Sequence, residues 1–170
     1  MFKKKKLRPN YKAVFIIMLF AVFFTFPQKI NGTGEIGQVR CVWYADTAEA
    51  DDTEIYLPYK ILFVGEYSDV CIAEILFTNL FENVSGKISL MPEDVKLLGV
   101  EISDGTLNLN VSSEILGYGG TAYENALAGQ IMRTASEIDG VTKLSLLIDG
   151  EIRPLCEGSV LENEKVPITI

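Results

Sequence analysis

Residues 95–115 have the sequence VKLLGVEISDGTLNLNVSSEI, and this stretch decides the fold. Asp104 and Gly105 stand in its middle, between a strand expected at Val95–Ile102 and a return strand whose apolar residues alternate, namely Leu107, Leu109 and Val111. Asp and Gly both accept positive φ angles, and two-residue turns of that kind match the twist of paired strands. The stretch therefore predicts a β-hairpin that turns at Asp104-Gly105.

A helix is expected soon after this hairpin, in residues 119–140, which are GGTAYENALAGQIMRTASEIDG. Gly119-Gly120 leads into Thr121 and Glu124, which have the spacing of a capping box. In that motif the Thr hydroxyl accepts the amide of the Glu, and the Glu carboxylate accepts the amide of the Thr. Polar and apolar residues then share one face at helical spacing, namely Ala126, Leu127, Gln130, Ile131, Thr134, Ala135 and Ile138. Asp139-Gly140 is typical of a helix end.

The chain continues with a predicted strand and a second tight turn. Val141–Ile148 is rich in Leu, Ile and Val, which favours a strand. Asp149-Gly150 repeats the turn signal and leads into a short return strand at residues 151–153. Residues 154–170 are mostly polar and are expected to form a C-terminal tail.

Two strands and one helix are expected before the hairpin. Val39–Ala45 alternates and contains β-formers, and Glu54–Val64 is extended again. Pro58 lacks an amide hydrogen, so it restricts the second strand to an edge or a bend. Ser68 is the expected N-cap of a helix of about three turns, with Asp69 placed favourably for the helix dipole.

The order of elements is β-β-α-β-β-α-β, which predicts the α+β class. We expect a single domain over residues 39–153, built from a small mixed sheet with two helices on one face. The other face of the sheet would be solvated or available to a partner.

The N-terminal residues 1–38 predict export or membrane anchoring. Residues 1–12 contain six bases and no acid, and Ala13–Phe26 is an apolar run of fourteen residues. Such a run makes about 21 Å of helix, shorter than the roughly 30 Å hydrocarbon core, which suits a signal peptide. Tyr11 and the flanking bases could extend it into a short anchor. Residues 27–38 are a polar, Gly-containing linker.

The positive-inside rule places residues 1–12 in the cytoplasm and residues 39–153 across the membrane. We therefore expect the protein at the cell membrane with its domain on the outer, extracytoplasmic side. It would be secreted if the apolar segment is cleaved.

Composition argues against nucleic-acid binding and catalysis. After residue 26 the chain holds nine Lys or Arg against all 23 Asp and Glu, a balance of −14 that repels phosphate backbones. His is absent, which removes the commonest general base and zinc ligand. Ser112-Ser113-Glu114 has no base to activate a serine and is expected to be a strand-to-loop turn. We predict no catalytic, cofactor-binding or metal-binding residues and no enzyme activity.

Three further features of the sequence allow both a structural and a functional interpretation. The acidic run Asp46–Glu54 lacks the spacing of a calcium loop and is expected to be a solvated turn. The helix start at Tyr118–Thr121 could hold an anion, although a capping box would already use two of its amides. Cys41 and Cys156 could form a disulfide, which spacing alone does not establish, and Cys71 is expected to pack as a small apolar residue.

The ordered motifs of this chain resemble the GerMN ("germane") family of sporulation and spore germination domains. Met91-Pro92-Glu93 is followed by the hairpin, the Gly-Gly-Thr-x-x-Glu helix start and the second strand ending in Asp-Gly. The resemblance is close over residues 91–153 and rests on the order of elements over residues 40–86. The motif residues are Asp104, Gly105, Gly119, Gly120, Thr121, Glu124, Asp149 and Gly150. The resemblance implies a non-catalytic module outside the membrane of spore-forming bacteria, with a fold similar to ring-building modules of envelope assemblies.

These observations favour a non-catalytic domain that acts in spore formation or germination by assembling with other cell-envelope proteins. The expected partners are such proteins and the membrane, reached through the N-terminal segment; nucleic acid is not expected, and self-association is left open. The alternative is a module that binds peptidoglycan fragments or a small germination signal. A concave polar pocket would favour the alternative, and a flat apolar sheet face would favour assembly.

Overall fold

The computed structural model describes residues 37–45, 56–82 and 88–167. The predicted signal or anchor at Ala13–Phe26 and the acidic run Asp46–Glu54 lie outside the described residues. Among the helices that are described, none has the length and apolar character needed to cross a bilayer.

The expected order of elements is confirmed, and the α+β class with it. The structure adds a 3-10 helix η1 and two short strands. The elements are β1 (Gln38–Ala45), β2 (Tyr56–Phe63), α2 (Asp69–Glu82), β3 (Leu97–Ser103), β4 (Thr106–Val111), η1 (Ser113–Leu116), α3 (Thr121–Ala135), β5 (Lys143–Ile148), β6 (Glu151–Ile152) and β7 (Glu164–Lys165).

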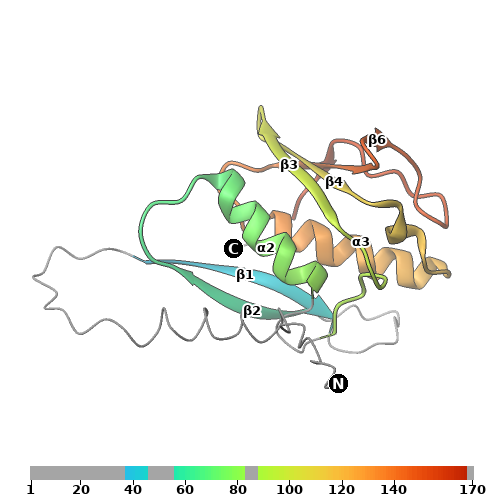
Figure 1. The fold of residues 1–170 in the computed structure, drawn as a ribbon, viewed down its shortest axis with the longest axis horizontal. Coiled ribbons are helices and arrows are strands. Elements are labelled where there is room, and N and C mark those ends of the chain that lie inside the picture. Colours follow the sequence, from blue (N-terminus) through green and yellow to red (C-terminus); the bar gives the residue numbers. More distant parts are fainter. Residues whose placement is uncertain (1–36, 46–55, 83–87, 168–170) are drawn as a thin grey trace, which may run out of the picture. The chain divides into compact units, whose positions relative to one another are not determined.

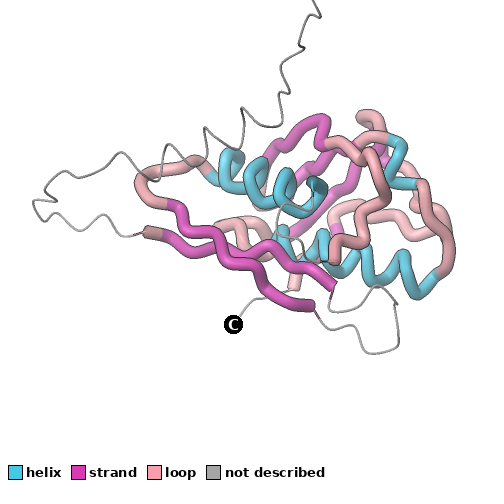
Figure 2. Tube along the Cα trace, turned by 60° about the horizontal axis from the view of Figure 1, so that its bottom comes forward, coloured by secondary structure: helices cyan, strands magenta, loops and turns pink. Residues whose placement is uncertain are grey.

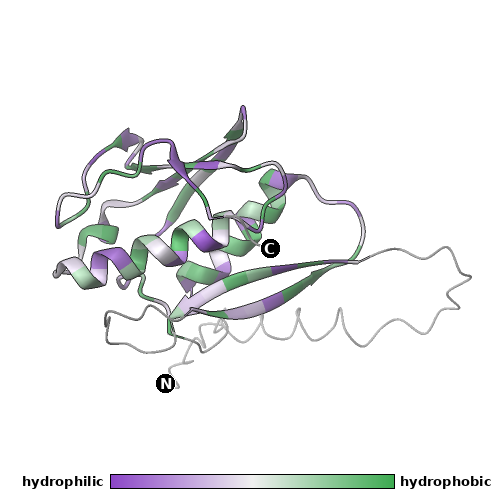
Figure 3. Ribbon diagram, turned by 180° about the vertical axis from the view of Figure 1, so that it is seen from behind, coloured by the Kyte–Doolittle hydropathy of each residue, from purple (hydrophilic) through white to green (hydrophobic). Residues whose placement is uncertain are grey.

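The larger sheet is mixed, as predicted, with the order β3-β4-β5-β6 and with β7 also paired to β5. β3 and β4 form the predicted antiparallel hairpin, and β4 runs parallel to β5 from Thr106 opposite Lys143 to Val111 opposite Ile148. The predicted alternation of β4 is confirmed, because its three apolar side chains are fully buried while its polar side chains are partly exposed. In Figure 3, green and purple segments alternate along the strands of the separate hairpin formed by β1 and β2.

β1 and β2 form a separate two-stranded antiparallel sheet instead of joining the larger one. Helix α2 packs against both β1 and β3, and α3 packs against β1. The helices therefore form a layer between the larger sheet and the β1–β2 hairpin (Figures 1 and 2). Helix α2 meets strands of both sheets, and α3 meets β1 and α2.

The edge of β1 that faces away from β2 is closed by α3 and by the turn that follows it. The backbone amide of Cys41 donates to Glu137 Oε2 at 3.0 Å, and that of Trp43 donates to Thr134 Oγ1 at 3.2 Å. These amides would otherwise be unpaired donors on a sheet edge. β2 has no second strand partner among the described residues, so the prediction that Pro58 occupies an edge strand is confirmed.

Helix α2 begins as predicted. The Ser68 hydroxyl accepts a hydrogen bond from the Cys71 amide at 3.2 Å, which makes Ser68 the N-cap. The buried face of the helix consists of Ile72, Ala73, Leu76, Phe77 and Leu80. This spacing of three and four places them on one side of the helix, where they join the core.

The expected C-terminal tail is part of the fold as far as residue 167. Leu155 is buried, the Leu146 amide donates to the Leu161 carbonyl at 2.9 Å, and Glu164–Lys165 pairs with the start of β5. The segment thus covers the edge of β5 that β4 leaves free. The sequence did not predict this pairing, because the segment is mostly polar and a strand of two residues is too short to show an alternating pattern.

Candidate functional site

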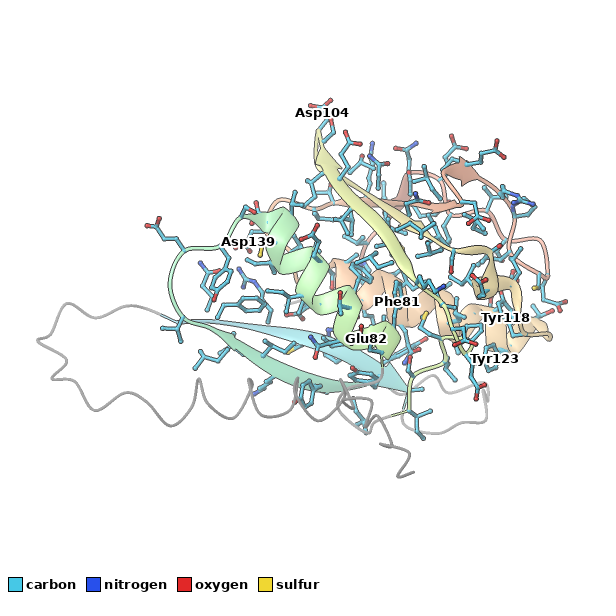
Figure 4. All side chains as sticks on the ribbon, viewed as in Figure 1. Phe81, Glu82, Asp104, Tyr118, Tyr123 and Asp139 are labelled. Carbon is cyan, nitrogen blue, oxygen red and sulfur yellow. The ribbon has the colours of Figure 1, made fainter. Side chains whose placement is uncertain are left out.

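The Asp104-Gly105 turn has the predicted geometry, with φ angles of 50° and 74°. The Gly105 carbonyl accepts the amides of Thr142 at 2.8 Å and Lys143 at 3.1 Å, so the turn is tied to the start of β5. A Cβ at Gly105 would lie 3.2 Å from the Gly140 oxygen, so this position requires glycine for space as well as for conformation. Figure 4 shows Asp104 at the tip of its hairpin.

The Asp149-Gly150 turn, with φ angles of 52° and 86°, lies at the opposite end of the parallel β4–β5 pair. The Asp149 amide donates to the Val111 carbonyl at 2.9 Å, and the Gly150 amide donates to Asn110 Oδ1 at 2.8 Å. The two Asp-Gly motifs therefore do not converge on one site. Each fixes the connection at one end of the same two strands.

The predicted capping box at the start of α3 is wrong. The N-cap is Gly120, whose φ of 101° favours glycine, and no side chain caps the helix. Thr121 is exposed, and the amide of Gly120 donates to Glu157 Oε1 at 2.7 Å. The helix start therefore already has a carboxylate of the same chain as its acceptor, supplied by the C-terminal segment rather than by Glu124.

Glu124 instead anchors the C-terminal segment, and its side chain is buried. Its Oε2 accepts the Tyr118 hydroxyl at 2.8 Å and the Glu157 amide at 2.6 Å, and its Oε1 accepts the Ser159 amide at 3.0 Å. Burial raises the pKa of this carboxyl, but the bonds from Ser159, Glu157 and Tyr118 outweigh burial and hold the pKa below its usual value. The carboxylate is therefore charged and fully bonded at neutral pH.

Tyr118 and Tyr123 stack beside this carboxylate, with ring centroids 5.2 Å apart (Figure 4). Burial, and then the bond to Glu124, raises the pKa of Tyr118, so its hydroxyl stays protonated and donates. The Tyr123 hydroxyl donates to the Leu90 carbonyl at 2.8 Å. The buried Gln130 accepts the Leu90 amide at 2.9 Å, so α3 fixes the segment before β3 at two points.

The serine that could be considered as a nucleophile, Ser112, has a structural role. The Ser112 hydroxyl accepts the Lys96 amide at 2.9 Å, and η1 follows it, so the turn expected at residues 112–114 is confirmed. Within the described residues, no three Cys, Asp or Glu side chains lie close enough together to hold a metal ion.

The three cysteines are free thiols, so the Cys41–Cys156 disulfide considered from the sequence is not formed. Cys156 Sγ donates to the Leu116 carbonyl at 2.9 Å. Cys71 is only partly buried. Burial, followed by the charge of Glu137, raises the pKa of Cys41 and so disfavours its reactive thiolate.

An exposed apolar surface on the β1–β2 hairpin was not predicted. Val39 and Leu62 are direct cross-strand partners, and they are 48% and 62% exposed. Val64, two residues after Leu62, is 54% exposed. We call these three residues the hairpin patch. The same strands carry apolar residues on their other side that are buried, namely Val42, Tyr44 and Phe63. The sequence therefore does not tell which apolar side of the hairpin is exposed.

The solved structures that match this chain include proteins from Bacillus subtilis and Clostridium perfringens. The tandem GerMN domains of the sporulation protein GerM from Bacillus subtilis share 23% identity with a TM-score of 0.57, over 82% of this chain and 49% of that chain. The first GerMN domain of GerM alone shares 17% identity with a TM-score of 0.56, over 76% and 97%. A Clostridium perfringens protein described as a lipoprotein shares 21% identity with a TM-score of 0.48, over 78% and 85%.

At these identities the two GerM structures show a similar fold and nothing further. No curated protein sequence matches the chain significantly. The Germane family, described as sporulation and spore germination, matches residues 42–153, which include every motif residue named above and all of β2, while Val39 lies just outside the match. The match spans more than half of the sequence, and the expected resemblance is thereby confirmed. The chain belongs to the Germane family of sporulation and spore germination domains.

Proposed function

We propose that this protein is a non-catalytic, membrane-associated domain outside the cytoplasm that acts in spore formation or germination by binding other cell-envelope proteins. Family membership supports the spore-related role. The basic N-terminus followed by an apolar run supports export or anchoring. Partner binding by the domain is supported by the hairpin patch.

The hairpin patch is the observation that carries this proposal. Val39 and Leu62 are neighbours across the hairpin, and the exposed Val64 follows two residues after Leu62, in a domain with a strongly acidic balance. Contiguous exposed apolar residues on a soluble domain mark interaction surfaces, because water contact with them is unfavourable until a partner covers them. The patch occupies the outer face of a two-stranded sheet whose inner face packs on the helices, so a partner can reach it without disturbing the core.

The free edge of β2 beside the patch favours side-chain contacts over strand addition. Pro58 offers no amide donor there, and Lys60 is exposed. Proline and lysine are the residues with which proteins protect an edge against pairing with another strand. We therefore expect the partner to cover the aliphatic face of the hairpin instead of extending its hydrogen-bonded ladder.

A matched pair of substitutions tests the proposal in sporulating cells. Leu62→Glu places a charge in the hairpin patch, while Leu98→Glu does the same at a leucine that is 48% exposed on β3 of the other sheet. Each full-length variant replaces the wild-type copy, and cross-linking with affinity capture is followed by spore counts and germination assays.

We expect Leu62→Glu to lose the cross-linked envelope proteins and to lower spore yield or germination, while Leu98→Glu behaves as wild type. Equal behaviour of Leu62→Glu and wild type in all assays would refute the role of the patch. Normal sporulation and germination after deletion of residues 40–153 would refute the proposed function. Protection of the domain from protease added outside intact protoplasts would contradict its extracytoplasmic location.

A further inference from the structure

We propose that a hollow at the start of β5 binds a small organic anion that carries phosphate or carboxylate groups. The hollow has a volume of about 480 Å³ and lies where the turn after α3 meets β5 and β7. Its polar lining comes from Ser136, Asp139, Thr142, Lys143 and Lys165. Sites for small molecules have volumes of roughly 300–1,000 Å³, so the hollow is large enough for such a ligand.

Two lysines lie side by side in the lining of this hollow. Lys143 of β5 and Lys165 of β7 are direct partners in the antiparallel register, and the Val166 amide fixes that register by donating to the Thr142 carbonyl at 3.1 Å. Direct partners have their Cβ atoms about 4.5–5.5 Å apart on the same face of the sheet, and like charges in such a pair destabilise it.

The described residues provide no counterion for either lysine. Within residues 37–45, 56–82 and 88–167, the ion pair between side chains is that of Arg40 with Asp139, and neither lysine takes part in it. Asp139 lines the hollow, but its charge is therefore already balanced by Arg40. The rim has two positive charges in excess, within a sequence whose balance after residue 26 is −14. An anion between the two ammonium groups would replace their repulsion by attraction.

The rest of the lining fits an anion with an apolar part. Ile138 and Val141, which are buried, and Val166, which is partly buried, line the hollow together with Pro167. Ligand sites commonly combine such an apolar wall with a few polar groups that fix orientation. The Lys143–Lys165 pair would provide the charge recognition.

A second hollow of the domain has an acidic lining, so the basic lining is not shared by both hollows. It measures about 510 Å³ and is lined by Glu93 and Glu114, with no lysine or arginine. The two hollows are therefore similar in volume and opposite in charge. An anion would be repelled by the second hollow and attracted by the first.

Binding of defined anions to the full chain in detergent micelles tests this proposal independently of the hairpin patch. Isothermal titration at low salt uses inorganic phosphate, phenyl phosphate and succinate as probes. We expect phenyl phosphate to bind more tightly than inorganic phosphate because of the apolar wall. Lys143→Gln and Lys165→Gln should each weaken binding about tenfold, the loss expected for one charge-assisted hydrogen bond.

The matched control is Lys60→Gln, which removes the same charge from an exposed position on β2. It should leave the affinity within about twofold of wild type. As a second readout, Lys165→Gln should raise the midpoint of unfolding slightly without anion, and phosphate should raise the midpoint of wild type more than that of the variant. Failure of all three probes to bind, or equal weakening by Lys60→Gln, would overturn the proposal.

Discussion

Replacing Glu124 by Gln tests the long-range anchor that closes the domain. The substitution keeps the shape of the side chain and removes its charge. In the wild-type protein the carboxylate accepts three hydrogen bonds, from the Tyr118 hydroxyl and from the amides of Glu157 and Ser159. A Gln amide has one oxygen, so it must point its NH₂ group at one of these donors.

The cost follows from this count of acceptors. If the amide oxygen takes the place of Oε2, it keeps Tyr118 and Glu157, and its NH₂ group faces the Ser159 amide. One charge-assisted bond, which contributes about 1.5–3 kcal/mol, is then lost. The two remaining bonds become neutral and weaken to roughly half. Together these losses lead us to expect the free energy of unfolding to fall by about 3–6 kcal/mol.

Urea unfolding of the full chain in detergent, followed by circular dichroism, measures this effect. With a slope of about 2 kcal/mol per M, the midpoint should fall by about 1.5–3 M at pH 7. Glu162→Gln is the control, because Glu162 is an exposed acid of the same C-terminal segment. A midpoint for Glu124→Gln within about 0.3 M of wild type would refute the anchoring role.

The dependence on pH gives the same experiment a second outcome. The folded-state pKa of Glu124 is lowered, so its contribution is fully present above the unfolded value of about 4.3. The contribution is lost as the pH falls through the lower folded value. The difference between wild type and Glu124→Gln should therefore be large at pH 7 and should shrink below about pH 4. A difference that stays constant down to pH 3 would contradict the assignment of a charged, buried carboxylate.

Two other substitutions test the hairpin turn and the β1 edge. Gly105→Ala should lower the free energy of unfolding by about 1 kcal/mol more than Gly150→Ala. Both residues have positive φ, but only Gly105 has a carbonyl oxygen 3.2 Å from the added Cβ. Equal urea midpoints for the two variants would contradict this expectation. Glu137→Ala should lower stability by about 1–3 kcal/mol and shift the fluorescence of Trp43, the single Trp, whose indole donates to Glu137 at 3.0 Å. An unchanged emission maximum would show that this bond is not formed in solution.

Local features of the fold could be predicted from the sequence, because neighbouring residues determine them. The Asp104-Gly105 turn needs two residues that accept positive φ, and the Ser68 cap needs a hydroxyl three residues before an amide. The same local reasoning failed at Thr121 and Glu124. There the spacing of a capping box is present, but Glu124 bonds to a segment more than thirty residues away in the chain.

The surfaces that carry the proposals depend on contacts that local patterns do not contain. The hairpin patch exists because the helices cover the other side of the β1–β2 sheet and leave Val39 and Leu62 uncovered. The pairing of Lys143 with Lys165 depends on a two-residue strand in a polar segment, so the sequence predicted neither the strand nor its register. Long-range pairing therefore decided both candidate surfaces.

The protonation state of the buried Glu124 carboxylate bears on whether this side chain could act as a general acid or base. A general acid or base works best when its pKa is close to the ambient pH, which for a carboxyl requires a raised value. The pKa of Glu124 is shifted the other way by donors that the fold itself supplies, and burial stabilises the protonated form of Tyr118 beside it. Proton transfer to or from Glu124 would break bonds that hold the C-terminal segment in place. The most enclosed acid among the described residues thus serves stability by holding the C-terminal segment against α3.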